Sequence, residues 1–165
     1  MPNWMGRYHS LMEALVLHGN TSARYINTKH EYAQDIFLTF QEGQVLEYII
    51  EHESDDDSMI RISERLGIPQ SSFSKYTKVL CGYDLVAKYQ MVNNRKNIIL
   101  KPTEKGKKVY EEHIRTSARI SFAPFFKALE PIPDEYLELM AQALTALDSD
   151  MHTPAPPEKS PLVKI

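Results

Sequence analysis

The segment from Pro69 to Cys81 constrains the fold more than any other part of the chain, because it is the clearest two-faced helical pattern in the sequence. Proline is favoured at the first position of a helix, so Pro69 fits just inside its start. The pattern predicts a helix that buries one face in a core and presents short polar and basic side chains on the other. The inward face would hold Phe73, Tyr76, Thr77 and Leu80 at i, i+3, i+4, i+7 spacing, and the outward face Ser71, Ser74, Lys75 and Lys78.

A shorter helix and a β-hairpin are predicted on either side of this segment. Ser58 is suited to cap a helix with Met59, Ile62 and Leu66 facing inward, and Gly67 would end it. After residue 84 the pattern becomes strand-like, in runs 85–91 and 98–101 around a polar turn at 93–96. Helix, turn, helix and hairpin in this order are typical of a DNA-binding domain.

Basic residues are concentrated between Ile60 and Tyr110. This segment contains eleven Lys and Arg residues against three Asp and Glu residues, a net charge of +8. The whole chain has 19 basic and 22 acidic residues and a net charge of −3, so the remainder carries −11. Such segregation produces a local positive field, which favours nucleic acid as the partner of this segment. The basic residues are Arg61, Arg65, Lys75, Lys78, Lys88, Arg95, Lys96, Lys101, Lys105, Lys107 and Lys108.

The rest of the chain is predicted to be helical. A helical pattern from about Trp4 to His30 is interrupted at Gly19-Asn20, where it could kink or break. Thr39 and Glu42 have capping-box spacing, which predicts a helix that buries Val45, Leu46, Ile49 and Ile50. Thr103 would cap a long helix to about Leu129, bent at Pro124. A last helix over 134–147 would face inward with Tyr136, Leu137, Met140, Leu144 and Leu147, and the proline-rich tail from Asp150 would be disordered.

Composition restricts the class of protein. The longest apolar stretches, such as residues 14–17, are far too short to span a bilayer, and the first residues lack the pattern of a secretion signal. Cys81 is the single cysteine, which excludes an internal disulfide and is compatible with a reducing cytoplasm. These features indicate a globular protein of the cytoplasm that is not inserted in a membrane.

The order of elements and several short strings together resemble the MarR family of winged helix-turn-helix transcription regulators. Asp84 replaces the family's turn glycine, which is tolerable because aspartate adopts left-handed geometry more easily than most residues. Asn94 replaces an acidic wing residue, and Pro102 stands where leucine is preferred. The matching strings are Leu38-Thr39 with Glu42, Arg65-Leu66-Gly67-Ile68 with Ser71-Ser72-Phe73-Ser74-Lys75, Asp84-Leu85-Val86, Asn94-Arg95-Lys96 and Thr103-Glu104-Lys105-Gly106.

The resemblance implies a mainly α fold with a small β-hairpin wing (α+β), in which dimerisation helices flank a winged helix-turn-helix lobe. Residues 1–37 would hold the N-terminal helix of the dimerisation arm, and residues 38–110 the DNA-binding lobe. Residues 111–149 would form the C-terminal dimerisation helices, and residues 150–165 the disordered tail. The implied function is that of a sequence-specific transcription regulator of the cytoplasm, a repressor because the family is mostly repressive. A homodimer would bind double-stranded DNA at a pseudo-palindromic operator and respond to a small aromatic effector.

The same resemblance assigns the DNA-binding residues, whereas the residues themselves show no motif for a cofactor, a metal or a catalytic group. Gln70, Ser71, Ser72 and Ser74 would contact base edges or phosphates, and Lys75 and Lys78 would neutralise phosphates. From the wing tip Arg95 or Lys96 would reach a minor groove, and Lys105 to Lys108 would lie beside the DNA backbone. The residues that bind an effector stay unassigned.

Other interpretations of these residues compete with the DNA-binding one. The basic face could be solvated or meet an acidic protein, which would make the lobe a protein–protein module without a specific DNA site. Cys81 could sense oxidation, but a buried small residue is the better interpretation. The scattered histidines favour no metal site, and Asp55-Asp56-Asp57 is expected to be a solvated loop whose charge keeps that edge clear of DNA. Tyr, Met and Phe side chains could line an effector pocket but are more often core, and no enzyme motif is present.

Overall fold

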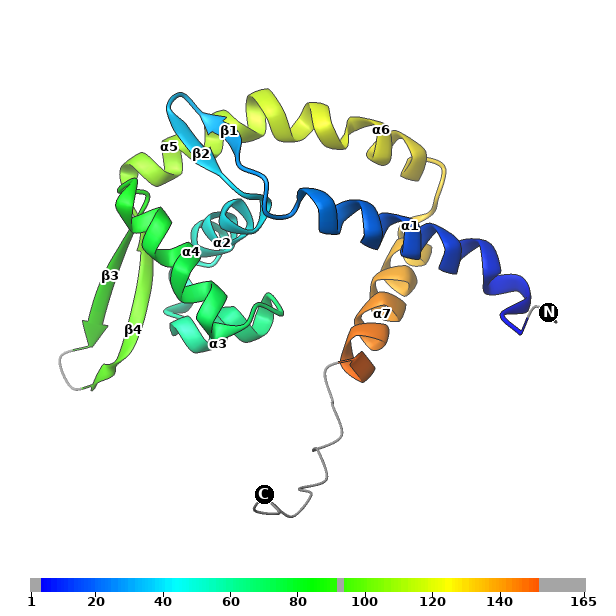
Figure 1. Ribbon diagram of the computed structural model, residues 1–165, viewed down its shortest axis with the longest axis horizontal. Coiled ribbons are helices and arrows are strands. Elements are labelled where there is room, and N and C mark those ends of the chain that lie inside the picture. Colours follow the sequence, from blue (N-terminus) through cyan, green and yellow to red (C-terminus); the bar gives the residue numbers. More distant parts are fainter. Residues whose placement is uncertain (1–3, 92–93, 152–165) are drawn as a thin grey trace, which may run out of the picture. The chain divides into compact units, whose positions relative to one another are not determined.

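The computed structural model describes residues 4–91 and 94–151, and it divides into two compact units, Met1–Arg119 and Ile120–Ile165 (Figure 1). The fold is mainly α with a small antiparallel β-hairpin wing, as predicted. Among the described residues, no helix is long and apolar enough to cross a membrane.

The first unit is built around a helix-turn-helix and its wing. Figure 1 shows the β3–β4 hairpin projecting from the group formed by α2, α3 and α4. The core lies where these elements meet, and its most buried side chains include Leu38, Leu46, Phe73, Leu80 and Leu85. The elements are α2 (Phe40–Glu51), η2 (Glu53–Asp55), α3 (Met59–Arg65), α4 (Gln70–Gly82), β3 (Val86–Met91), β4 (Asn94–Pro102) and α5 (Glu104–His113).

The predicted helix caps are confirmed. The Thr39 hydroxyl accepts from the Glu42 amide at 3.2 Å, and the Glu42 carboxylate accepts from the Thr39 amide at 2.8 Å. This capping box satisfies donors that the first turn of a helix leaves unpaired. The Ser58 hydroxyl accepts from the Arg61 amide at 3.3 Å, as its predicted role at the start of α3 requires.

The N-terminal region differs from the prediction. A 3₁₀ turn (η1, Gly6–Tyr8) leads into α1 (His9–Tyr25), which continues through Gly19 without a break. The predicted helix to His30 is wrong at its end, because β1 (His30–Ala33) and β2 (Ile36–Leu38) form an antiparallel hairpin there. Asp35 has φ +60 and supplies the left-handed residue that turns the chain. Segments of three or four residues are too short to show a helix or strand period, so sequence alone could not identify these strands.

The predicted long helix after Thr103 contains a π-helical segment. A π-helix, η3 (Ile114–Ala118), follows α5 and leads into α6 (Arg119–Leu129), which contains Pro124. Thr103 caps α5 by accepting from the Gly106 amide at 2.9 Å.

The second unit contains α7 (Asp134–Met151), which extends beyond the predicted end at Leu147. The predicted tail therefore begins inside this helix, and residues 152–165 of the tail lie outside the described residues. The face of α7 that was predicted to point inward is not buried within the chain. Leu137 is half-buried, and the other four side chains of that face are exposed. Those four are Tyr136, Met140, Leu144 and Leu147.

Candidate nucleic-acid interface

Helix α4 separates its side chains between a buried and an exposed face, as its sequence predicts. Phe73, Thr77 and Leu80 are buried, and Tyr76 is half-buried. The Thr77 hydroxyl donates to the Phe73 carbonyl at 2.8 Å, so this buried polar group has a partner. The opposite face is continuous and polar. It consists of Gln70, Ser71, Ser74, Lys75 and Lys78, all exposed, with Ser72 half-buried beside them.

The turn between α3 and α4 places the second helix. Gly67 has φ +63, a left-handed conformation that ends α3 after Leu66 with little steric cost. The Ile68 amide then donates to the Ser63 carbonyl at 2.9 Å, and Pro69 occupies the N-cap position of α4. Pro69 was predicted one position later, just inside the helix. Ile68 itself is buried, which fixes this turn to the core.

The wing has more strand and a shorter turn than predicted. Asn94 pairs with Met91, so Asn94, Arg95 and Lys96 belong to β4 rather than to the predicted turn at 93–96. The tip itself, residues 92–93, lies outside the described residues. Arg95 and Lys96 thus occupy the end of β4 next to the tip. A β-bridge between Ser58 and Ile99 joins the strand to the start of α3.

The basic segment contains two groups of cations with different surroundings. Lys75 and Lys78 are exposed and form no ion pair with any other residue that the structure describes. Lys108 is exposed in the same way, whereas the Lys105 ammonium donates to the Tyr83 carbonyl at 2.7 Å. That Lys105 to Lys108 lie beside the DNA backbone stays a prediction. A second set is paired with acidic residues of the protein, namely Arg61, Arg65, Lys101 and Lys107.

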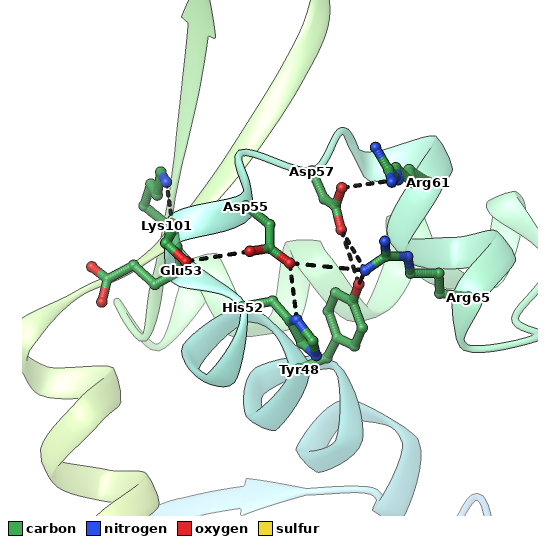
Figure 2. Close-up of polar contacts among 9 residues, drawn as sticks. Tyr48, His52, Glu53, Asp55, Asp57, Arg61, Arg65 and Lys101 are labelled. Atoms are coloured by element: carbon green, nitrogen blue, oxygen red, sulfur yellow. Dashed lines mark hydrogen bonds and ion pairs between the residues drawn. The ribbon is translucent and has the colours of Figure 1, made fainter.

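The acidic loop Asp55-Asp56-Asp57 pairs with three members of this second group, Arg61, Arg65 and Lys101. The prediction that the loop is solvated is wrong for its third residue. Asp57 is only 6% exposed. One of its carboxylate oxygens accepts from Arg61 Nε at 3.1 Å, and the other from Arg65 Nη1 at 3.2 Å and the Tyr48 hydroxyl at 2.9 Å (Figure 2). Two guanidinium groups and a phenol thus compensate a nearly buried negative charge. Sequence could not reveal this, because burial of the third aspartate depends on how α2 and α3 pack.

Tyr48 and His52 on α2 complete the network around this loop. The Tyr48 hydroxyl also accepts from Arg65 Nη1 at 2.7 Å, and burial together with Asp57 raises the pKa of the tyrosine. The His52 ring stacks on Tyr48 with centroids 4.3 Å apart and lies 3.0 Å from the Asp55 carboxylate. This hydrogen bond holds the pKa of Asp55 below its usual value.

A second polar cluster joins α2, α5 and the β1–β2 hairpin, and sequence analysis did not detect it. The Tyr110 hydroxyl donates to Glu47 at 2.8 Å and lies 3.1 Å from Glu51. Burial and these carboxylates raise the pKa of Tyr110. Nearby, the rings of Tyr32 and His113 stack with centroids 3.7 Å apart and planes inclined by 10°. No sequence signal marks this cluster, because its members come from three separate elements.

The remaining candidate sites within the DNA-binding lobe are small, whereas a more open hollow of about 470 Å³ lies along α1, beside Met12 and Val16. Cys81 is partly buried beside the core, and burial raises the pKa of its thiol, which favours the unreactive protonated form. Among the described residues, no group of three or more His, Cys, Asp and Glu side chains could hold a metal. A hollow of about 180 Å³ beside the start of α4 includes Gln70 and Ser74 in its lining. That volume is below the roughly 300–1,000 Å³ of typical ligand pockets, so this hollow is not assigned as an effector site.

Comparison with solved structures gives the fold. No profile of a known protein family and no curated protein matches the sequence. BldR, a transcriptional regulator from Sulfolobus solfataricus, has a TM-score of 0.67 at 18% identity, with 87% of this chain and 99% of that chain covered. MepR from S. aureus in complex with DNA has a TM-score of 0.62 at 17% identity, covering 87% and 98%. A mutant of MarR from E. coli, complexed with operator DNA, has a TM-score of 0.62 at 15% identity, covering 86% and 98%. This chain has the winged-helix fold of these MarR-family regulators.

Proposed function

We propose that this protein is a sequence-specific DNA-binding transcription regulator that acts as a homodimer. The observation that carries the proposal is the face of α4, where Lys75 and Lys78 are exposed and unpaired among the described residues, next to Ser71 and Ser74. Short polar side chains allow a helix to approach base edges closely, and lysines add phosphate contacts. The structural neighbours support this role, since MepR and the MarR mutant are described in complex with DNA. BldR is described as a transcriptional regulator, which also favours a function other than catalysis.

In the proposed complex each protomer contributes one α4 to the major groove. Gln70, Ser71, Ser72 and Ser74 contact base edges or phosphates, and Lys75 and Lys78 neutralise phosphates. Arg95 or Lys96, next to the tip of the wing, reaches the adjacent minor groove. Two-fold symmetry then requires a pseudo-palindromic operator with half-sites about 34–36 Å apart or a multiple of that distance. The regulation is repression, relieved by a small aromatic effector that favours one dimer geometry.

A salt series on the full-length protein tests the proposal. Affinity for a duplex found by selection from genomic fragments is measured by fluorescence anisotropy between low and moderate salt. Replacing both Lys75 and Lys78 with alanine should reduce the slope of log K against log salt by about 0.9 for each phosphate that the protein no longer neutralises. The control removes the same charge elsewhere, by replacing Arg24 and Lys29 with alanine, and should keep the wild-type slope.

Two outcomes would oppose the proposal. If the wild-type protein binds no duplex even at low salt, the lobe is not a DNA reader. The alternative, a winged helix that binds an acidic protein partner, would then explain the basic face. If the duplex is bound but the double alanine variant keeps the wild-type slope, α4 is not the surface that contacts DNA.

A further inference from the structure

The loop between α2 and α3 connects several parts of the DNA-binding lobe. We call residues Glu53–Asp57 the acidic turn. Asp57 binds Arg61 and Arg65 of α3, as described above. Asp56 pairs with Lys101 of β4, whose ammonium also donates to the Glu53 carbonyl. Figure 2 shows Lys101 approaching the turn from the wing strand while Arg61 and Arg65 approach from α3.

The same loop is also attached to the wing through its backbone and to α5 through a side chain. Ser58, the residue after the acidic turn, forms a β-bridge with Ile99 of β4. Lys101 lies two residues farther along that strand, so a backbone contact and an ion pair hold β4 to one short segment. The Glu53 carboxylate binds the Lys107 ammonium at 2.8 Å, and this contact raises the pKa of Lys107. Helix α3, strand β4 and helix α5 are therefore all bound to the same short segment, the acidic turn and Ser58.

This arrangement has a consequence for DNA reading, given the function proposed above. A winged helix binds when its second helix and its wing reach two different grooves at the same time. Their relative position must then be set before DNA is met, because ordering them on binding would reduce affinity. We propose that the acidic turn is a positioning element, with Asp56 and Lys101 as the positioning pair, that holds the wing at the angle to α3 and α4 that DNA requires.

The proposal predicts an effect of opposite sign to simple electrostatics. Asp56→Asn removes a negative charge from a lobe that would bind a polyanion, so charge alone would strengthen DNA binding. If Asp56 positions the wing, its loss weakens binding instead. Asparagine is the suitable replacement because Asp56 has φ +49, a left-handed conformation that asparagine tolerates. Asp57 is unsuitable for this test, because removing one partner from a nearly buried ion pair threatens folding itself.

The experiment measures operator affinity for wild type, Asp56→Asn, Lys101→Met and the double variant. Each single variant should bind about two- to fivefold more weakly, the range that an exposed ion pair contributes. The double variant should be no weaker than the singles, because the pair is already broken. Lys101→Arg keeps a positive charge opposite Asp56 and should bind like wild type. Glu64→Gln is the matched control. It also removes a negative charge, from an exposed side chain of α3, and should leave binding unchanged or slightly tighter.

Hydrogen exchange without DNA gives an independent readout. Amides of β3 and β4 should exchange faster in Asp56→Asn than in wild type, whereas those of α4 should not change. Unchanged exchange at β4, or DNA binding that Asp56→Asn tightens or leaves unchanged, would overturn the proposal. If wild type binds no duplex at all, the proposed regulator function fails, and the role of the acidic turn in DNA binding fails with it. Hydrogen exchange would still show whether the acidic turn holds β4 in place. The two failures are therefore distinguishable.

Discussion

The surroundings of His113 determine which protonation state of its ring is favoured. Its ring stacks on Tyr32, and its Nδ1 atom is buried with no hydrogen-bond partner among the described residues. Burial lowers the pKa of this histidine, while the Tyr32 backbone and the charge of Glu47 on α2 partly oppose the effect. The neutral ring is therefore favoured in the folded protein.

This depressed pKa predicts how stability changes with pH. The unfolded chain binds a proton at His113 near the ordinary pKa of 6.5, but the folded protein does so only at lower pH. The contribution of His113 is thus fully present above pH 6.5 and is lost as the pH falls through the folded value. His113→Phe keeps a ring against Tyr32 but cannot titrate. Urea unfolding at fixed protein concentration should show that wild type loses more stability than the variant between pH 7.5 and 5.5.

The comparison between the two proteins isolates one histidine. The other five histidines of the sequence are present in both proteins, so their contributions cancel in the difference. An identical pH dependence in wild type and variant would show that the ring of His113 titrates normally in the folded state.

At the scale of elements, α5 is fixed to the turn that joins α4 to the wing. The Thr103 amide donates to the Leu85 carbonyl at 3.0 Å, and its hydroxyl to the Asp84 carbonyl at 2.7 Å. Asp84 has φ +59, the left-handed conformation for which the sequence suggested that aspartate is suited. The first turn of α5 therefore lies directly against backbone, and the motif that begins with Thr103 needs a glycine at its fourth position.

Substitution of that glycine should be strongly destabilising. A Cβ atom on Gly106 would lie 2.1 Å from the Leu85 carbonyl oxygen, a backbone atom that cannot move aside easily. We expect Gly106→Ala to reduce the free energy of unfolding by about 3 kcal/mol, the upper part of the range for overpacking. Gly82→Ala is the control, because nothing lies within 4 Å of its added Cβ. Its effect should stay within about 1 kcal/mol. Equal losses in chemical denaturation would contradict this account of the contact.

At the scale of the whole molecule, many large apolar side chains outside the lobe have no cover. Exposed apolar surfaces of this extent on helices mark sites of association. A second copy of the chain is the occupant we propose, since the function above requires two α4 helices. The exposed residues are Trp4, Tyr8, Leu11, Val16, Leu17 and Tyr25 in the N-terminal region, and Phe122, Phe125, Phe126, Tyr136, Leu139, Met140, Leu144 and Leu147 in α6 and α7.

Charges placed on the apolar face of α7 should therefore prevent dimerisation. Met140 and Leu144 are each 41% exposed and lie one turn apart on that face. Replacing both with glutamate should shift the mass in solution to the monomer value of 19.0 kDa, measured by light scattering, while circular dichroism shows a folded lobe. The control adds glutamate at Gln142 and Thr145 on the opposite face and should remain dimeric. A wild-type protein that is monomeric at micromolar concentration would refute the dimer.

The sequence by itself determined the features that depend on neighbours three or four residues apart. The caps at Thr39 and Ser58 and the two faces of α4 follow from such local spacing, and the structure confirms them. The winged-helix order was predictable for the same reason, since each element has its own period and its own end signal.

Only the tertiary structure decided which basic side chains are paired within the protein and which remain available to bind a partner. Lys75 and Lys101 look equivalent in sequence, but Lys101 binds the Glu53 carbonyl across 48 positions of the chain, and Lys75 binds no described residue. Pairing over such a distance depends on how α2, α3 and the wing pack, and no local pattern encodes it. The sequence therefore showed that this segment carries a net positive charge. The fold was needed to show which of its cations are exposed and which form ion pairs within the lobe.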